Sequence, residues 1–284
     1  MSAKSTVETT GQYIHGSRPE EQERLSILNE ILNEGYLRQM GLKPGQRVLD
    51  VGSGLGQFAQ IMARTVAPDG MVLGIERDPQ QMATARRLLN SGEAAQDPVP
   101  LKFRRGDALK LPLLPDEVES FDVVHARFLL EHVPNPGDVI RQMLRAVRPG
   151  GRIILSDDDH STFNPTPEPA GFPALWQAYL RSYDRLGNDP FIGRRLVALL
   201  HEAGLKRIRN SIVFFGGCAH QSVFALVAEN LIGVLRGAQD TILEESLLDP
   251  SVFQAAIEGL HTWKQRPDAA LWYGICWAEG VKAS

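Results

Sequence analysis

Three glycines stand at alternate positions in the segment VLDVGSGLGQ, residues 48–57. An apolar run of strand character precedes them, and a helical stretch follows them. Glycines at a strand-to-helix turn let the backbone bend sharply and let a ligand approach main-chain N–H groups at the start of the helix. The segment therefore predicts a loop that binds a nucleotide-like ligand.

The spacing of the glycines indicates which ligand fits. Loops that bind nicotinamide dinucleotides follow the pattern G-x-G-x-x-G, whereas here the third glycine is Gly56 and the next position holds Gln57. Asp50 lies two residues before the first glycine, where a carboxylate can hold the ammonium group of an amino-acid ligand, directly or through water. The same carboxylate would repel a pyrophosphate. The loop therefore favours a sulfonium amino acid over a dinucleotide.

Two further acids follow the next apolar runs. Glu76 ends the second run, where a carboxylate can accept hydrogen bonds from both ribose hydroxyls of a nucleoside. Asp107, in Gly106-Asp107-Ala108 after the third run, can accept from an adenine amino group while the adjacent backbone N–H donates to a ring nitrogen. Taken singly, Glu76 fits a solvated strand end and Asp107 fits a turn cap. Their order after the glycine loop favours a nucleoside site.

Alternating strands and helices must position these residues. The strands are short apolar runs, and two of the helices begin with an Asx N-cap followed by Pro. This alternation predicts parallel βαβ units in a doubly wound α/β sheet that is covered on both faces. The expected strands are residues 47–51, 71–76, 101–104, 121–125 and 152–156, and the expected helices are residues 57–66, 79–89 and 136–147.

The flanking regions add helices. Upstream, Ser17 and Glu20 fit a capping box that opens an amphipathic helix reaching Tyr36. Residues 162–190, rich in Pro and aromatics, are expected to form a helical lid above the strand ends, where α/β sheets bind ligands; a helix packed on the sheet edge is the alternative. Beyond the fifth strand the expected helices are residues 168–186, 191–203 and 222–263, and the expected strands are residues 206–215 and 272–278.

The order of these motifs resembles the class I S-adenosylmethionine (SAM) dependent methyltransferases, in the branch that acts mostly on small molecules. The resemblance is strongest over residues 44–160, where FDVVHARFLLEHV at 121–133 and LRAVRPGG at 144–151 follow the glycine loop and the two acids. It implies SAM as cofactor and a Rossmann-like, mostly parallel sheet of seven strands with the last antiparallel. Residues 1–40 would form an arm and helix covering the cofactor, and residues 41–284 the methyltransferase domain, with a lid at about 162–190 and a helical stretch at about 220–265.

The resemblance also assigns cofactor contacts. An N-terminal Tyr13 would cover the sulfonium, and Arg24 would pair with the cofactor carboxylate through a fork of donors; otherwise Tyr13 anchors a flexible arm and Arg24 is a surface charge. By position, the methionine part is assigned to Asp50, Gly52, Ser53, Gly54 and Gln57, the ribose to Glu76, the adenine to Arg77, Met82, Gly106, Asp107 and Ala108, and the sulfonium region to Ala126 and Arg127.

The acceptor side is indicated by the segment DDDH at residues 157–160, directly after the fifth strand. Carboxylates there can deprotonate an attacking group or hold a cationic one, and His160 can act as a general base near neutral pH. A helix N-cap or a solvated turn explains the acids as simply. Methyl transfer is an in-line displacement at the sulfonium, and it needs a base only when the nucleophile carries a proton. We predict His160 and Asp158 as catalytic, with acceptor contacts from His132, Asp157, Trp176 and Tyr179.

Composition limits the partners. The chain has 284 residues, with 30 Lys and Arg against 34 Asp and Glu, and its basic residues are scattered. This distribution argues against nucleic acid and for a small-molecule acceptor, which the aromatic lid suggests is bulky or apolar. Cys218 and Cys276 lack metal-binding spacing, so no metal is predicted. No apolar stretch is long enough to span a membrane, and we expect a cytoplasmic protein. The sequence leaves a homodimer open.

Two other functions compete with methyl transfer. One is a methyltransferase-like protein that binds SAM as an accessory subunit or catalyses another reaction, because an intact cofactor site says nothing about transfer. The other is an NAD(P)-dependent oxidoreductase, which would share Glu76 and the parallel sheet but lacks the required glycine spacing.

Overall fold

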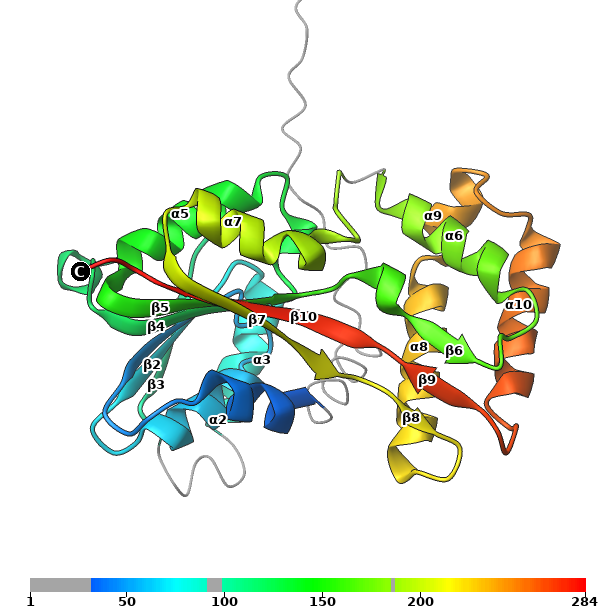
Figure 1. Ribbon diagram of the computed structural model, residues 1–284, viewed down its shortest axis with the longest axis horizontal. Helices are drawn as coiled ribbons and strands as arrows, with labels where there is room; N and C mark the ends of the chain where they lie inside the picture. Colours follow the sequence, from blue (N-terminus) through cyan, green and yellow to red (C-terminus); the bar gives the residue numbers. More distant parts are fainter. Residues whose placement is uncertain (1–31, 91–98, 185–186) are drawn as a thin grey trace, which may run out of the picture.

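The computed structural model describes residues 32–90, 99–184 and 187–284. Tyr13, Arg24 and the expected capping box at residues 17–20 lie outside the described residues. A seven-stranded sheet in the order β3-β2-β1-β4-β5-β10-β7 forms the centre of the described chain (Figure 1). Its strands are β1 (Arg47–Val51), β2 (Met71–Glu76), β3 (Leu101–Arg105), β4 (Phe121–Arg127), β5 (Val147–Asp157), β7 (Lys206–Phe214) and β10 (Gly274–Val281).

Strand directions match the expected sheet. The pairs among β1 to β5 are parallel. The last strand, β10, is antiparallel to both of its neighbours, β5 and β7. The prediction of a mostly parallel sheet of seven strands with the last strand antiparallel is therefore confirmed.

Helices cover both faces of the sheet (Figure 1). Residues 32–40 are helical and pack with α2 (Gln57–Val66) on one face, whereas α5 (Pro136–Ala146) and α7 (Leu196–Glu202) lie on the other. Buried Tyr36 and Met62 belong to the first layer, and Met143 and Leu200 to the second. The doubly wound arrangement is thus confirmed.

Local signals explain where the helices begin. The N-cap Asp78 accepts hydrogen bonds from Gln80 N and Gln81 N, both at 2.8 Å, and Pro79 opens α3 (Pro79–Leu89). Pro136 opens α5 in the same way, although its N-cap Asn135 makes no side-chain capping bond. Pro fits the first helical position because its fixed φ suits a helix and its missing N–H would have no partner there.

A second unit, here called the cap, combines two segments that the sequence analysis treats separately. It consists of β6 (Asn164–Thr166), α6 (Phe172–Ser182), β8 (Gly217–Cys218), α8 (Ser222–Gly237), α9 (Gln239–Glu244), α10 (Pro250–Trp263) and β9 (Ala270–Trp272). The three short strands form an antiparallel sheet in the order β6-β9-β8. Since β5 runs into the cap and β10 returns from it, the cap lies beyond the carboxyl end of β5 (Figure 1).

Two expected boundaries in this region were wrong. The single helix expected over residues 222–263 is three helices, α8, α9 and α10. The last of them is separate because Asp249 caps a new helix that begins at Pro250, a residue that cannot continue the preceding helix. The single strand expected over residues 272–278 is β9 followed by β10, and the two belong to different sheets. No helix within the described ranges is both long and apolar enough to cross a membrane.

Candidate cofactor and acceptor site

The glycine loop turns tightly at the carboxyl end of β1. Gly52, Gly54 and Gly56 have φ of 76°, 55° and 73°, a left-handed conformation that glycine adopts without strain. The N–H groups of Gly52 and Ser53 donate to the carbonyl of Ile75 at 2.8 and 3.0 Å, which fastens the loop to β2. The loop then leads through Gly56 into the N-terminus of α2, as predicted.

Glu76 joins this loop to the next one. Its Oε2 accepts from Gly54 N at 2.9 Å, and its Oε1 accepts from Asp78 N at 2.8 Å. Burial raises the pKa of Glu76. Glu76 is therefore a positioned and partly buried carboxylate and not a solvated strand end. Each oxygen keeps a second lone pair with which it can accept from a ribose hydroxyl.

Asp50 has a partner that the sequence analysis missed. Its Oδ1 lies 2.8 Å from Nδ1 of His125, and both side chains are buried. Parallel pairing of β1 with β4 places the two residues side by side. His125 thus fixes the orientation of the carboxylate that is predicted to meet the ammonium group of the cofactor. This contact could have been predicted only from the register in which β1 pairs with β4.

The predicted adenine residues gather near Glu76. The N–H of Gly106 donates to the carbonyl of Glu76 at 3.0 Å, which brings residues 106–108 beside the carboxyl end of β2. Asp107 caps its own turn, since its Oδ1 accepts from Leu109 N at 2.8 Å. Met82 is buried on α3, and Arg77 is exposed just before it. The structure therefore places these residues around one edge of the sheet, and their contacts with adenine remain a prediction.

Arg127 ties the end of β4 to the first described helix. Its Nη1 donates to Asn33 Oδ1 at 3.2 Å, and its guanidinium carbon lies 4.3 and 4.7 Å from the ring centroids of Phe58 and Tyr36. Burial lowers the pKa of Arg127. These rings stabilise the cation through their π faces. Helix 32–40, which continues from the arm predicted to cover the cofactor, thus lies against the sulfonium region assigned to Ala126 and Arg127.

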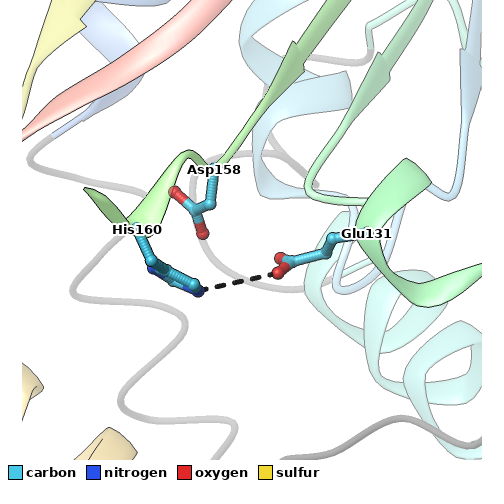
Figure 2. A group of neighbouring side chains, drawn as sticks. All are labelled: Glu131, Asp158 and His160. Carbon is cyan, nitrogen blue, oxygen red and sulfur yellow. Dashed lines mark ion pairs between the residues drawn. The ribbon is translucent and has the colours of Figure 1, made fainter. Parts of the chain in front are cut away.

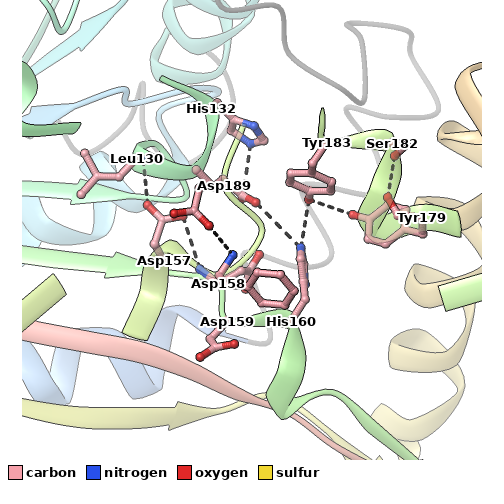
Figure 3. Close-up of polar contacts among 12 residues, drawn as sticks. Leu130, His132, Asp157, Asp158, Asp159, His160, Tyr179, Ser182, Tyr183 and Asp189 are labelled. Carbon is pink, nitrogen blue, oxygen red and sulfur yellow. Dashed lines mark hydrogen bonds and ion pairs between the residues drawn. The ribbon is translucent and has the colours of Figure 1, made fainter. Parts of the chain in front are cut away.

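The side chains of residues 157–160, at the end of β5 and just after it, point in different directions (Figure 3). Asp157 turns back to the sheet, where its Oδ2 accepts from Leu129 N at 3.2 Å and Leu130 N at 2.7 Å. Asp159 is buried against Arg194, where its carboxylate accepts from two Arg194 nitrogens at 2.8 Å and from the N–H of Ser161 in a 3-10 turn. The expectation of an N-cap is therefore confirmed for Asp159 alone.

Asp158 and His160 begin a chain of hydrogen bonds into the cap. The Tyr273 hydroxyl donates to Asp158 Oδ1 at 2.6 Å, so its oxygen must accept from Nδ1–H of His160 at 3.0 Å. The Nε2 lone pair then accepts from the Tyr183 hydroxyl at 2.9 Å, which lies 3.0 Å from the Tyr179 hydroxyl. Burial lowers the pKa of His160 to about 3. His160 is thus a neutral link with both nitrogens engaged.

The carboxyl group of Glu131 lies near Nε2 of His160 (Figure 2). Its Oε1 is 3.3 Å from Nε2 of His132, and its Oε2 is 3.8 Å from Nε2 of His160. Burial, with the negative charges of Asp158 and Asp157, raises the pKa of Glu131 well above its ordinary value. Burial and Asp158 likewise raise the pKa of Asp157 to about 8, and burial lowers that of His132 to about 3. The structure therefore concentrates buried ionisable groups where β4 and β5 end.

The predicted acceptor residues of the cap join the same cluster. Trp176 and Tyr179 lie on α6, and their rings pack against His160 with centroids 5.5 and 5.6 Å away. Phe163 stacks on Trp176 at 4.6 Å. Aromatic side chains of the cap therefore form an apolar wall beside the polar groups at the end of β5.

Comparison with known proteins decides the family. Residues 42–186, about half of the chain, match the family model described as a methyltransferase domain. The chain belongs to the class I SAM-dependent methyltransferases. The prediction of SAM as the cofactor is thereby confirmed, and the oxidoreductase alternative is set aside.

Individual relatives agree with this family. The 27-O-demethylrifamycin SV methyltransferase of Amycolatopsis mediterranei is 37% identical over 160 residues, which are 56% of this chain and 54% of the relative. A ubiquinone/menaquinone biosynthesis C-methyltransferase of Ectopseudomonas mendocina is 34% identical over 141 residues, 46% of this chain and 52% of the relative. The chain spans about half the length of these curated relatives. The YcgJ protein of Bacillus subtilis, 16% identical, has the same fold, with a TM-score of 0.56 over 90% of this chain and 99% of that chain.

The residues present fit the cofactor of this methyltransferase family. At the glycine loop, the hydroxyl of Ser53 is buried and makes no hydrogen bond within the described part of the chain. The carboxylates of Glu76 and Asp107 suit the ribose hydroxyls and the adenine amino group, and Met82 offers an apolar contact for the ring. The described residues thus offer polar groups that suit the ribose and the adenine of SAM.

Tyr273 is the residue of this methyltransferase that the sequence analysis missed at the acceptor side. It lies far along the chain from Asp158, with which it bonds. The antiparallel register that pairs Cys276 with Asp157 brings Tyr273 beside His160. Only the pairing of the last strand with the fifth could have indicated it.

Proposed function

We propose that this chain transfers the methyl group of SAM to a small organic acceptor that is held between the carboxyl edge of the sheet and the cap. The observation that carries the proposal is the position of the Asp158 and His160 network. It begins at the end of β5, on the same sheet edge as the glycine loop and Glu76, and it continues into the cap through Tyr183. Donor and acceptor can therefore meet at this edge.

The reaction needs few groups from the protein. The acceptor nucleophile attacks the methyl carbon, the carbon–sulfur bond breaks, and its electron pair stays on the sulfur of S-adenosylhomocysteine. Alignment of the two reactants supplies much of the rate acceleration. If the nucleophile is a hydroxyl or an amine, its proton must leave, and we assign Asp158 to accept it. His160, whose two nitrogens are engaged, connects Asp158 to the cap tyrosines and acts as a link between them.

The cap supports an apolar and bulky acceptor. The rings of Trp176 and Tyr179 pack against His160, beside the polar groups at the end of β5, so that a hydrophobic body and a reacting polar atom can be held together. The names of the relatives, 27-O-demethylrifamycin SV methyltransferase and ubiquinone/menaquinone biosynthesis C-methyltransferase, refer to small organic molecules. The cytoplasmic location remains a prediction from the sequence, which leaves a homodimer open.

The N-terminal arm belongs to the same proposal. Helix 32–40 reaches Arg127 through Asn33 and Tyr36, at the strand end assigned to the sulfonium. An arm that continues from this helix can cover the methionine part of SAM, with Tyr13 and Arg24 in the roles predicted for them.

Incubation with methyl-labelled SAM tests the proposal. The purified protein is mixed with fractions of a small-molecule extract and with a panel of hydroxylated and aminated aromatic compounds. We expect label to move to a small molecule and S-adenosylhomocysteine to accumulate in equal amount. Tight SAM binding without label transfer would instead identify a SAM-binding protein that does not methylate.

A further inference from the structure

Three potential metal ligands meet between the sheet and the cap. Glu131 follows β4, whereas Asp158 and His160 follow β5, and their ligand atoms all lie within 4.8 Å of one another (Figure 2). Glu131 and His160 are buried and Asp158 is half-buried. Figure 2 shows the two carboxylates and the imidazole directed toward a common space.

Glu131 lacks a partner for one oxygen. Its Oε2 is buried and has no hydrogen-bond partner by geometry among the described residues. The Tyr183 hydroxyl lies near this carboxyl group and lowers its pKa, against the larger effect of burial, but its hydrogen bond is to Nε2 of His160. Nε2 of His160, at 3.8 Å, is too far away for a hydrogen bond. As a carboxylate, Oε2 has no donor, and as a carboxylic acid its hydroxyl has no acceptor. Because buried polar groups are nearly always paired, this atom points to a ligand that it binds.

His160 is oriented as metal-binding histidines usually are. Such a histidine donates its second ring N–H to an oxygen, which fixes the tautomer and aims the other nitrogen at the metal. Here Nδ1–H donates to Tyr273, whose hydroxyl in turn donates to Asp158. The lone pair of Nε2 therefore points toward the side where Glu131 lies.

We propose that Glu131, Asp158 and His160 bind one divalent first-row transition-metal ion, of which Zn²⁺ is the representative. Two carboxylate oxygens and one imidazole nitrogen suit such ions, whereas Mg²⁺ and Ca²⁺ prefer oxygen ligands alone. The two carboxylates balance the charge of the ion, and the ion supplies Glu131 Oε2 with a partner. The Tyr183 hydroxyl, which donates to Nε2, must turn away when the ion binds.

This set is not visible in the spacing of ligands along the sequence, because two separate loops contribute to it. With three protein ligands, the ion keeps coordination positions for water or for an oxygen of a ligand. Binding of the acceptor oxygen at that position would rest on the proposed methyl transfer. Binding of the ion does not rest on it, and it can be measured without SAM or acceptor.

Direct titration tests the site. The full chain is stripped with EDTA, dialysed, and titrated with Zn²⁺ by calorimetry and with Co²⁺ by visible absorption, which reports the coordination of the ion. We expect one ion per chain. Glu131→Gln, Asp158→Asn and His160→Gln each remove a direct ligand, so each should weaken binding at least as much as loss of an outer-shell partner does, by about 100-fold or more. Tyr183→Phe should bind at least as tightly, because Nε2 loses a competing donor.

Matched variants exclude binding elsewhere. Asp159→Asn changes the neighbouring acid, which faces Arg194, and His201→Gln changes an exposed histidine on α7. Both should bind the ion as the unaltered chain does, and thermal unfolding confirms that every variant is folded. Absence of ion binding, equal affinity in the three ligand variants, weaker binding in Tyr183→Phe, or tighter binding of Mg²⁺ than of Zn²⁺ would each overturn the proposal.

Discussion

At the level of single residues, the carboxylate of Glu76 holds two loops of the cofactor site together through Gly54 and Asp78. Glu76→Gln removes the charge while keeping one acceptor oxygen. A hydrogen bond to a charged group contributes about 1.5–3 kcal/mol, so the dissociation constant of SAM should rise about 10- to 100-fold. Isothermal titration measures the change. Glu202→Gln, on an exposed position of α7, is the control and should bind SAM normally.

The same carboxyl group predicts a pH dependence of SAM binding. Burial raises the pKa of Glu76, so it takes up a proton at pH values at which an ordinary glutamate is still ionised. A protonated carboxyl accepts fewer hydrogen bonds, and on acidification the affinity for SAM should therefore begin to fall at a higher pH than an ordinary glutamate would cause. In Glu76→Gln this component of the pH dependence should disappear. An identical pH profile in the two proteins would show that another group controls binding.

Tyr273 is a positioning residue that connects His160 with Asp158. Tyr273→Phe removes one oxygen and breaks both hydrogen bonds, so kcat for an acceptor that must lose a proton should fall about 100-fold if the network supports proton transfer. The dissociation constant of SAM should not change, and the pH profile of kcat should shift. Tyr179→Phe removes an oxygen from the far end of the same chain and should have a smaller effect. Equal losses in both variants would indicate a packing defect.

At the level of elements, the turn from β1 into α2 depends on Gly56. Its φ is +73°, and a Cβ there would lie 2.3 Å from Cζ of Phe103. Gly45 has φ +84° and nothing within 4 Å of such a Cβ. Gly45→Ala should therefore lower the free energy of unfolding by about 1–2 kcal/mol through backbone strain alone.

Gly56→Ala combines the same strain with overpacking. It should cost about 1–3 kcal/mol more than Gly45→Ala, and it should abolish SAM binding because the loop moves. Urea denaturation of both variants gives the difference. Equal destabilisation of Gly56→Ala and Gly45→Ala would mean that the Phe103 ring moves to accommodate the new methyl group.

The elements that the sequence predicted well are those with strong local signals. The bounds of β1 and α2 were correct because an apolar run, three glycines and an amphipathic stretch adjoin one another. The small sheet of the cap was missed because its strands have two or three residues, and β6 contains Pro165. The start of α10 was overlooked although Asp249-Pro250 carries the same signal as Asp78-Pro79.

A site residue was predictable where the same short segment contains both the residue and the motif that indicates its role. Glu76 and Asp107 each follow an apolar run, and the family motifs fixed their order. The partners of Asp50 and Asp158 were not predictable in this way. His125 depends on the register of β1 and β4, and Tyr273 on the pairing of the last strand with the fifth. Contacts across strands require the assembled sheet.

At the level of the whole molecule, the sheet and the cap share one hydrophobic core. Buried residues of helix 32–40 and α2 form a continuous cluster with those of α6, α8 and α10. We therefore expect one cooperative unfolding transition. Leu260→Ala, a fully buried change in the cap, should lower the free energy of unfolding by about 2–5 kcal/mol and shift the entire transition.

Tryptophan fluorescence and far-ultraviolet circular dichroism in urea measure this transition. The two signals should change together in the unaltered protein and in Leu260→Ala. Val252→Ala, on the exposed side of α10, should have little effect. A cap that unfolds separately, seen as two steps in Leu260→Ala, would contradict a shared core.

The central claim is that the glycine loop and Glu76 form a SAM site in this chain. Isothermal titration of the purified protein with SAM, and separately with NAD⁺, tests it most directly. We expect one SAM bound per chain, displaceable by S-adenosylhomocysteine, and no binding of NAD⁺. Absence of SAM binding by the folded protein, or binding of NAD⁺ in its place, would contradict the claim.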